Sequence, residues 1–320
     1  MPAFRVGDPG SNPGRGKEFS TPKESFGRNL DAWLPWRTLT NWDCILMTKS
    51  GPQNSASHKV RLKGEQQTLL ITLYARALDY RSEHPILNDK RASEIAMSID
   101  YDFETLRGFG NGSIMVARAR QIDEWLRGFL GTNQNAVVLN VGCGLDTRVS
   151  RINPPSNVSW FDLDYPAVIE ERRNFYHDQE GYEMLEASLT DQKWFEMLPT
   201  GRPTMVIADG VMEYLSEDEA KSFLDALPDH FPSGQVVFDV MSSFAVESGN
   251  PKLKEKMQAV HRWAVDDVNE VDRLSPKLKR LDNSSVFWSK YLPLKYRLVF
   301  GIAGIIPSAR NTIRLLRYEF

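Results

Sequence analysis

The sequence predicts an α/β protein with a doubly wound, mainly parallel sheet. Four short apolar runs alternate with helical stretches over residues 136–241, and such alternation favours parallel strands joined by right-handed crossovers. Gly142 and Gly144 follow the first run, where folds of this class bring backbone close to a ligand. We also expect helices ahead of the sheet and an antiparallel strand near the C-terminus.

Composition and charge narrow the class of protein. The 320-residue chain is 41% hydrophobic and 25% charged, which is typical of a globular protein with one large domain or two small ones. A net charge of −3 argues against a nucleic-acid partner. Two cysteines, Cys44 and Cys143, give no disulfide framework. Neither a signal peptide nor a membrane span is indicated, so we expect a cytoplasmic protein.

The chain divides near residue 57. Residues 1–57 are rich in Gly, Pro and Ser and lack a sustained period, which predicts a disordered or loosely attached extension; its Trp-rich patch, Trp33–Trp42, is alternatively a partner-binding element. Residues 58–320 form the expected domain. Its first helices are predicted at residues 69–78 and 92–97.

A longer helix is predicted from Ile114, because apolar residues recur at helical spacing up to Leu130. Arg118 lies on the same stripe. A guanidinium cannot shed its charge, so a buried Arg118 needs an anion. That anion is either a ligand or a neighbouring carboxylate such as Asp123 or Glu124.

The apolar runs that follow predict the strands of the sheet, with a helix at residues 217–227 between the last two. They are Ala136–Val141, Ser159–Asp164, Thr204–Asp209 and Gln235–Met241. The closing segment, Thr312–Phe320, alternates poorly and is expected to add a last strand at the sheet edge.

The glycine pair is followed at the right distance by an acidic residue. Asp164 stands twenty residues after Gly144, where a nucleoside-binding unit places a carboxylate on the ribose hydroxyls. A helix N-cap is the alternative role, and Asp162 shares its side of the strand. Thr147 stands where a dinucleotide fingerprint has its third glycine, which counts against a nicotinamide oxidoreductase.

Five motifs in order resemble the leucine carboxyl methyltransferase family, including its tetracenomycin-type polyketide carboxyl methyltransferases. The resemblance runs from about Gly64 to the C-terminus. The motifs are Ala117-Arg-Ala-Arg-Gln-Ile-Asp123, Leu139-Asn-Val-Gly-Cys-Gly-Leu-Asp-Thr-Arg148, Trp160-Phe-Asp-Leu-Asp-Tyr-Pro166, Ala187-Ser-Leu-Thr-Asp191 and Ala208-Asp-Gly-Val-Met-Glu-Tyr-Leu215.

The resemblance implies a Rossmann-like class I methyltransferase fold that binds S-adenosylmethionine. It assigns the methionine carboxylate to Arg118, the backbone-close loop to Gly142 and Gly144, the ribose to Asp164, the adenine edge to Ser188 and Leu189, and a place beside the cofactor to Asp209. No metal is implied.

Three positions depart from the family pattern. The family commonly has Asp at the position of Ser188 and Glu at that of Asp209, so the hydrogen bond to the adenine amino group is expected to be weaker or water-mediated. A basic residue that some relatives use as a second clamp on the carboxylate falls near Thr72.

The acceptor implied by the resemblance is a carboxylate. A carboxylate is already ionised at neutral pH and needs no general base, whereas a phenol does. His177, His230 and His261 are isolated in the sequence, so no catalytic residue is assigned, and Tyr214 is the candidate acceptor contact or a packing residue. We expect a small, polyketide-like acid; a protein C-terminal carboxylate and a non-catalytic Rossmann-like scaffold are the alternatives.

Two lysine-rich runs, and one segment that mixes aromatic, basic and apolar residues, are the remaining candidates for contact with the acceptor. Lys252–Lys256 and Lys277–Arg280 are interpreted as solvated helix faces, with attraction of an acidic substrate as the alternative. Trp288–Pro307 either covers the acceptor pocket or packs on the core.

Overall fold

The computed structural model describes residues 58–320, apart from 107–108, 110 and 304–310. The extension predicted for residues 1–57, with its Trp-rich patch, lies outside the described residues. So does part of the mixed segment Trp288–Pro307.

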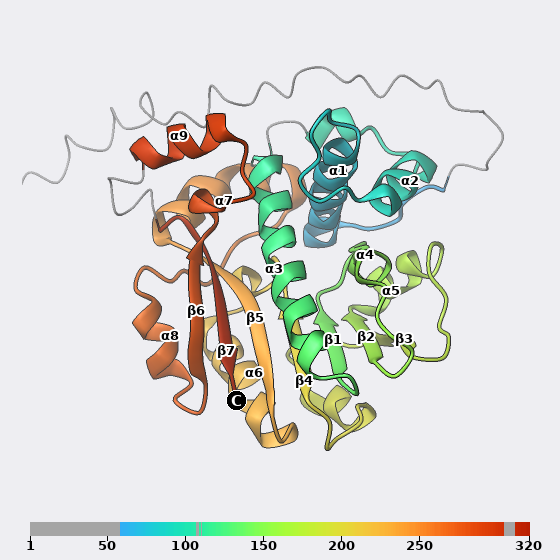
Figure 1. The fold of residues 1–320 in the computed structure, drawn as a ribbon. Coiled ribbons are helices and arrows are strands. Elements are labelled where there is room, and N and C mark those ends of the chain that lie inside the picture. Colours follow the sequence, from blue (N-terminus) through green and yellow to red (C-terminus); the bar gives the residue numbers. More distant parts are fainter. Residues whose placement is uncertain (1–57, 107–108, 110, 304–310) are drawn as a thin grey trace, which may run out of the picture. The chain divides into compact units, whose positions relative to one another are not determined.

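A seven-stranded sheet lies at the centre of the described domain, in the strand order β3-β2-β1-β4-β5-β7-β6 (Figure 1). All neighbouring pairs among the first five strands are parallel. The strand β7 runs antiparallel to both β5 and β6, so the predicted mainly parallel sheet with a C-terminal antiparallel strand is confirmed. The strands are β1 Val137–Val141, β2 Ser159–Asp164, β3 Tyr182–Glu186, β4 Thr204–Ala208, β5 Gly234–Met241, β6 Lys279–Ser285 and β7 Ile313–Glu319.

The position expected for the last strand was wrong. β7 lies between β5 and β6 rather than at the edge, and Leu315, Leu316 and Tyr318 are buried in it. A strand covered on both faces carries apolar residues without strict alternation, which explains its poor pattern. The edge is formed by β6, none of whose side chains is fully buried.

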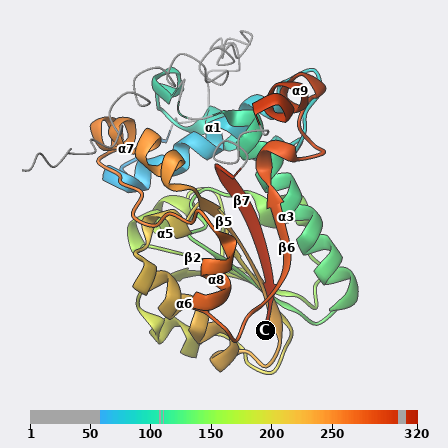
Figure 2. The same cartoon turned by 90° about the vertical axis from the view of Figure 1, so that its left-hand side faces the viewer.

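Helices cover both faces of the sheet. Figure 2 shows α3 on one side and α6 with α8 on the other. Phe223, Leu224 and Leu227 of α6 join the main core with the buried strand residues, and Ser216 forms a capping box with Glu219 at the start of α6. The helices are α1 Leu69–Tyr80, α2 Lys90–Ser98, α3 Gly112–Thr132, α4 Arg148–Ile152, α5 Pro166–Arg172, α6 Glu217–His230, α7 Ser243–Met257, α8 Val268–Leu274 and α9 Leu294–Ala303.

A second core lies at the carboxyl ends of the parallel strands. It joins α1, α2 and α7 to the loop after β1, through buried residues such as Leu73, Ile95, Leu253 and Leu145. Figures 1 and 2 both show α1 and α7 above this end of the sheet. The helices expected ahead of the sheet therefore cover the end where such folds bind ligands.

The two lysine runs differ in structure. Lys252, Lys254 and Lys256 are exposed on α7, as a solvated helix face requires. Lys277 and Lys279 are exposed as well, but their expected place on a helix was wrong, because α8 ends at Leu274 and the run Lys277–Arg280 leads into the edge strand β6. No helix among the described residues is long and apolar enough to cross a membrane.

Candidate active site

The residues expected to bind the cofactor gather at the carboxyl ends of four neighbouring strands. Gly142 follows β1, Asp164 ends β2, and Asp209 follows β4 directly. Ser188 comes two residues after β3. Because parallel strands end at the same edge of the sheet, residues far apart in sequence form one site.

The loop after β1 is shaped by its two glycines. Gly142 and Gly144 have φ angles of +60° and +48°, which side chains rarely adopt. A Cβ on Gly142 would lie 2.3 Å from a methyl carbon of Val211, and one on Gly144 would lie 3.1 Å from Leu69. Packing within the protein is therefore enough to require glycine at both positions, independently of any role in approaching a ligand.

Asp164 is tied to the glycine loop. Its Oδ2 accepts from the backbone N–H of Gly144 at 2.8 Å, and its Oδ1 accepts from that of Tyr165 at 2.7 Å. It caps no helix through the usual N2 or N3 amide, since α5 begins after Tyr165 with Pro166 in its first turn. Burial raises the pKa of Asp164 to about 6, although both hydrogen bonds oppose the shift.

Asp162 is a structural residue. Its carboxylate is fully buried and accepts hydrogen bonds from Asn140, Trp160, Arg172 and Tyr182. No oxygen of Asp162 is left for a ligand, so of the two strand carboxylates only the partly exposed Asp164 is placed to meet one.

The two aspartates of β2 are expected to respond differently to replacement by Asn. Asp164→Asn should weaken S-adenosylmethionine binding about tenfold or more, because a charged acceptor is lost, and leave the urea midpoint nearly unchanged. Asp162→Asn should lower the unfolding free energy by about 3 kcal/mol, because buried Arg172 loses its carboxylate. Wild-type binding should also weaken as the pH falls through 6, where Asp164 becomes neutral. Equal effects of both variants on binding would contradict the assignment.

The segment after β3 presents a polar edge. Ser188 Oγ hydrogen-bonds Thr190 Oγ1 at 2.8 Å, and Ser188 partly opposes the rise that burial causes in the pKa of Tyr165. Leu189 packs into the main core, while its backbone N–H donates no hydrogen bond to another described residue. A free amide beside a polar side chain suits the edge of a purine base.

Arg118 is buried, as expected from its helix stripe, but its partners are not those considered. Its Nε lies 2.7 Å from Asp209 Oδ1, and its Nη1 donates to Asp239 Oδ2 at 2.5 Å. The suggested pairing with Asp123 or Glu124 is wrong: Asp123 meets Arg148, and Glu124 meets Lys290. Helix α3 therefore contributes a cation to the carboxyl ends of β4 and β5. Protein carboxylates already supply its anion, so burial of Arg118 alone does not demand a ligand.

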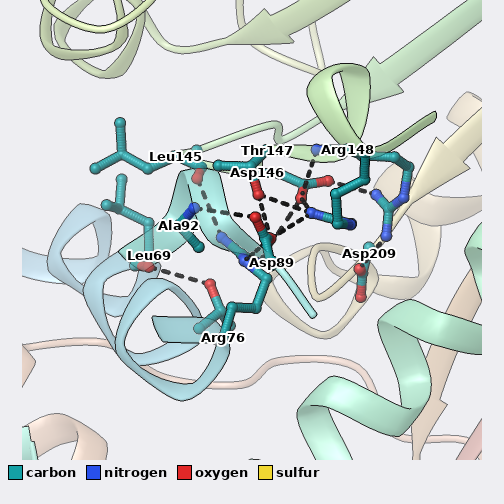
Figure 3. A network of polar contacts seen from close by, with 12 residues as sticks. Leu69, Arg76, Asp89, Ala92, Leu145, Asp146, Thr147, Arg148 and Asp209 are labelled. Atoms are coloured by element: carbon teal, nitrogen blue, oxygen red, sulfur yellow. Dashed lines mark hydrogen bonds and ion pairs between the residues drawn. The ribbon is translucent and has the colours of Figure 1, made fainter. Parts of the chain in front are cut away.

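A second buried arginine connects three elements. Arg148 is fully buried, and it binds Asp123 of α3, Asp146 of the glycine loop and Asp209 after β4, at 2.8, 2.5 and 2.8 Å. Figure 3 shows Arg76 of α1 and Asp89 before α2 at the other side of the same loop. Arg76 Nη2 donates to the carbonyl of Leu145 at 3.1 Å. Ion pairs thus hold the glycine loop between the N-terminal helices and β4.

Charges inside this network shift its pKa values. Burial favours the neutral form of Asp209, but Arg118 and Arg148 outweigh burial and hold the pKa of Asp209 below its ordinary value. Asp146 behaves likewise beside Arg148 and Arg151, and its pKa is strongly lowered. Both carboxylates are therefore ionised at neutral pH.

Tyr214 stands in the short helix Met212–Tyr214 after β4. Its ring contacts that of His261 at 5.1 Å between centroids, and burial raises the pKa of its hydroxyl, a shift that Thr68 partly opposes. Burial lowers the pKa of His261 to about 4, so this imidazole is neutral and weakly basic. The tyrosine is half-buried, and it is one of the groups that raise the pKa of Arg118.

Comparison with known proteins shows the family to which the chain belongs. The family model of leucine carboxyl methyltransferase matches residues 69–227. The chain is 36% identical over 267 residues to the tetracenomycin polyketide synthesis O-methyltransferase of Streptomyces glaucescens, covering 82% of this chain and 98% of the relative. The chain belongs to the leucine carboxyl methyltransferase family. This family member is also 32% identical over 244 residues to an S-adenosyl-L-methionine-dependent methyltransferase of Gibberella zeae, covering 69% of this chain and 82% of that protein.

The fold of this methyltransferase agrees with the sequence comparisons. A crystal structure of a candidate methyltransferase from Thermobifida fusca matches with a TM-score of 0.51 at 15% identity, over 76% of this chain and 93% of that one. The expected class I methyltransferase fold is thereby confirmed. The family member is an S-adenosylmethionine-dependent O-methyltransferase.

Some polar atoms of the methyltransferase have no hydrogen-bond partner among the described residues. Arg118 Nη2 donates no hydrogen bond to a described residue, and it lies against Gly210, where a Cβ would approach it to 2.9 Å. Buried Glu213 has an Oε2 without a partner. Together with the free amide of Leu189, these atoms fit a ligand with an amino-acid end and a base.

Sequence reasoning missed several residues of this site. Asp239 carried a signal, because it is a charged residue inside an otherwise apolar strand run. Glu213 lies in a motif that carried the family resemblance, next to the residue chosen there, Tyr214. Arg148 likewise ends a motif that carried the resemblance, but its partner Asp209 lies 61 residues away in the chain. Arg76 carried no signal, since its partner Leu145 lies 69 residues away.

Proposed function

We propose that this enzyme methylates a carboxylate of a small, polyketide-like acid. The relation to the Streptomyces glaucescens polyketide enzyme carries the proposal, because the match extends over 98% of that protein. The small-molecule acceptor is favoured over a protein C-terminus on the same ground. We further propose residues 58–320 as the methyltransferase domain.

The proposed cofactor contacts follow from the strand ends. Arg118 would hold the methionine carboxylate through Nη2, Asp164 the ribose hydroxyls, and the Ser188–Leu189 segment the adenine edge. Gly142 and Gly144 would line the loop that approaches the cofactor, and Asp209 would hold Arg118 in place. The bound sulfonium supplies an electrophilic methyl group.

The chain's own contribution is to bind and orient the two reactants and to exclude water. A carboxylate acceptor is a nucleophile without help. That suits the surroundings of Tyr214, since His261 has a pKa of about 4 and is too weak a base for a phenol of pKa about 10. Tyr214 would contact the acceptor.

A hydroxyl acceptor is the second candidate, because one observation favours it. Burial, followed by the charge of Asp239, raises the pKa of Glu213 to about 8, and a carboxylate of that pKa is a competent base for a phenol. Glu213 is only 5% exposed, however, so its access to an acceptor is poor.

The chemistry of the product distinguishes the two acceptors. The enzyme is given labelled S-adenosylmethionine with a polycyclic aromatic acid, or with a matched phenol that lacks the carboxyl group. We expect methylation of the acid and release of the label as methanol in mild alkali, because the product is an ester. The phenol should remain unlabelled. Label that survives alkali would show an aryl ether and contradict carboxyl methylation.

A further inference from the structure

Glu213 is a buried carboxyl group with an unused oxygen. It lies in the short helix after β4, next to Tyr214, and is 5% exposed. Its Oε2 is buried and has no hydrogen-bond partner. An unpartnered oxygen in such a place is costly unless a ligand meets it or a proton neutralises it.

The groups around Glu213 come from three neighbouring elements. Asp239 of β5 and Asp209 after β4 are like charges, and Arg118 of α3 is the opposing one. Arg118 already forms ion pairs with both aspartates. Glu213 is therefore the third carboxyl group around one guanidinium, and no ion pair of its own is formed with a described residue.

The buried ion-pair network around Glu213 also contains more carboxyl groups than arginines. Its ion pairs connect four arginines with five aspartates, and Glu213 adjoins them as a sixth carboxyl group: Arg76, Arg118, Arg148 and Arg151 face Asp89, Asp123, Asp146, Asp209, Asp239 and Glu213. A buried cluster with more carboxylates than cations favours either a bound proton or a bound cation.

We propose that Glu213 binds the α-ammonium group of S-adenosylmethionine and gives up its proton to solvent when the cofactor enters. The inference rests on the proposed contact between Arg118 and the methionine carboxylate. Ammonium and carboxylate are attached to the same carbon, so a cofactor held by Arg118 brings its ammonium next to the carboxyl groups that surround Arg118.

The proton follows from charge balance. In the free enzyme Glu213 is mainly neutral at pH 7, since its pKa is about 8. The ammonium ion takes the place of the proton as the neighbour of Oε2, and an opposite charge at hydrogen-bond distance lowers the pKa of a carboxyl group. The demethylated cofactor carries the same ammonium group and should release the proton as well.

Titration calorimetry counts this proton. S-adenosylmethionine is titrated into the full chain at pH 7 in phosphate and in Tris, whose ionisation enthalpies differ, and the difference in heat gives the protons released. Wild-type enzyme should release about 0.9 proton more than Glu213→Gln, as a group of pKa about 8 requires. Comparing the two cancels protons exchanged by other groups. S-adenosylhomocysteine should give the same difference.

The controls separate the possible failures. Glu217→Gln makes the same change at an exposed position in the first turn of α6 and should release protons like the wild type. Glu213→Gln should bind the cofactor about tenfold more weakly. Binding with equal proton release in wild type and Glu213→Gln overturns this inference alone, whereas absence of wild-type binding overturns the proposed function. If Glu213→Gln does not fold, wild-type binding without any buffer dependence overturns the inference by itself.

Discussion

Replacing Arg148 with Ala is expected to lower the free energy of unfolding by about 3–5 kcal/mol, because it removes one cation from three carboxylates of a buried network that already has more carboxylates than arginines. Arg148 is fully buried and binds Asp123, Asp146 and Asp209. Urea unfolding followed by circular dichroism measures the loss.

The pH dependence should change in the same variant. The strongly lowered pKa of Asp146 stabilises the wild-type fold above its unfolded value of 3.8, and this stabilisation is lost as the pH falls below that value. Without Arg148 the acid loss should be shallower. Arg173→Ala is the matched control, since its pair with Asp178 is well exposed and should contribute under about 1 kcal/mol. Equal urea midpoints for Arg148→Ala and wild type would contradict the structural role of the network.

The sequence was sufficient to predict most strands of the parallel part of the sheet. The runs that became β1, β2, β4 and β5 are buried on both faces and therefore read as continuous apolar segments. β3 escaped notice because its residues mix exposed and buried positions, and β6 because none of its positions is buried. The placement of β7 depends on its pairing with β5, a long-range contact that its own residues do not reveal.

The positions of some candidate site residues could be predicted for the same reason. Gly142 and Asp164 occupy strand ends, so their position along the chain indicates their position in space. The partners of Arg118 depend on which side chains meet between α3, β4 and β5, and this is a property of packing. Local spacing suggested Asp123, yet α3 directs that residue to Arg148 and Arg151.

Replacing Arg118 is expected to have the largest effect on cofactor binding. Arg118→Ala would remove the charged donor proposed for the methionine carboxylate and leave Asp209 and Asp239 to repel that carboxylate. The loss of one charged hydrogen bond corresponds to about 1.5–3 kcal/mol, or roughly 10- to 150-fold in Kd. Arg118→Lys keeps the charge but loses the guanidinium fork, so it should fall between Ala and wild type.

Titration calorimetry of wild type and Arg118→Ala with S-adenosylmethionine tests the central claim most directly, with NAD as the comparison ligand. A cofactor site around Arg118 at the carboxyl ends of the strands predicts saturable wild-type binding of S-adenosylmethionine, none of NAD, and at least tenfold weaker binding by a folded Arg118→Ala. Binding of NAD without heat from S-adenosylmethionine, or equal affinity of Arg118→Ala and wild type, would contradict it.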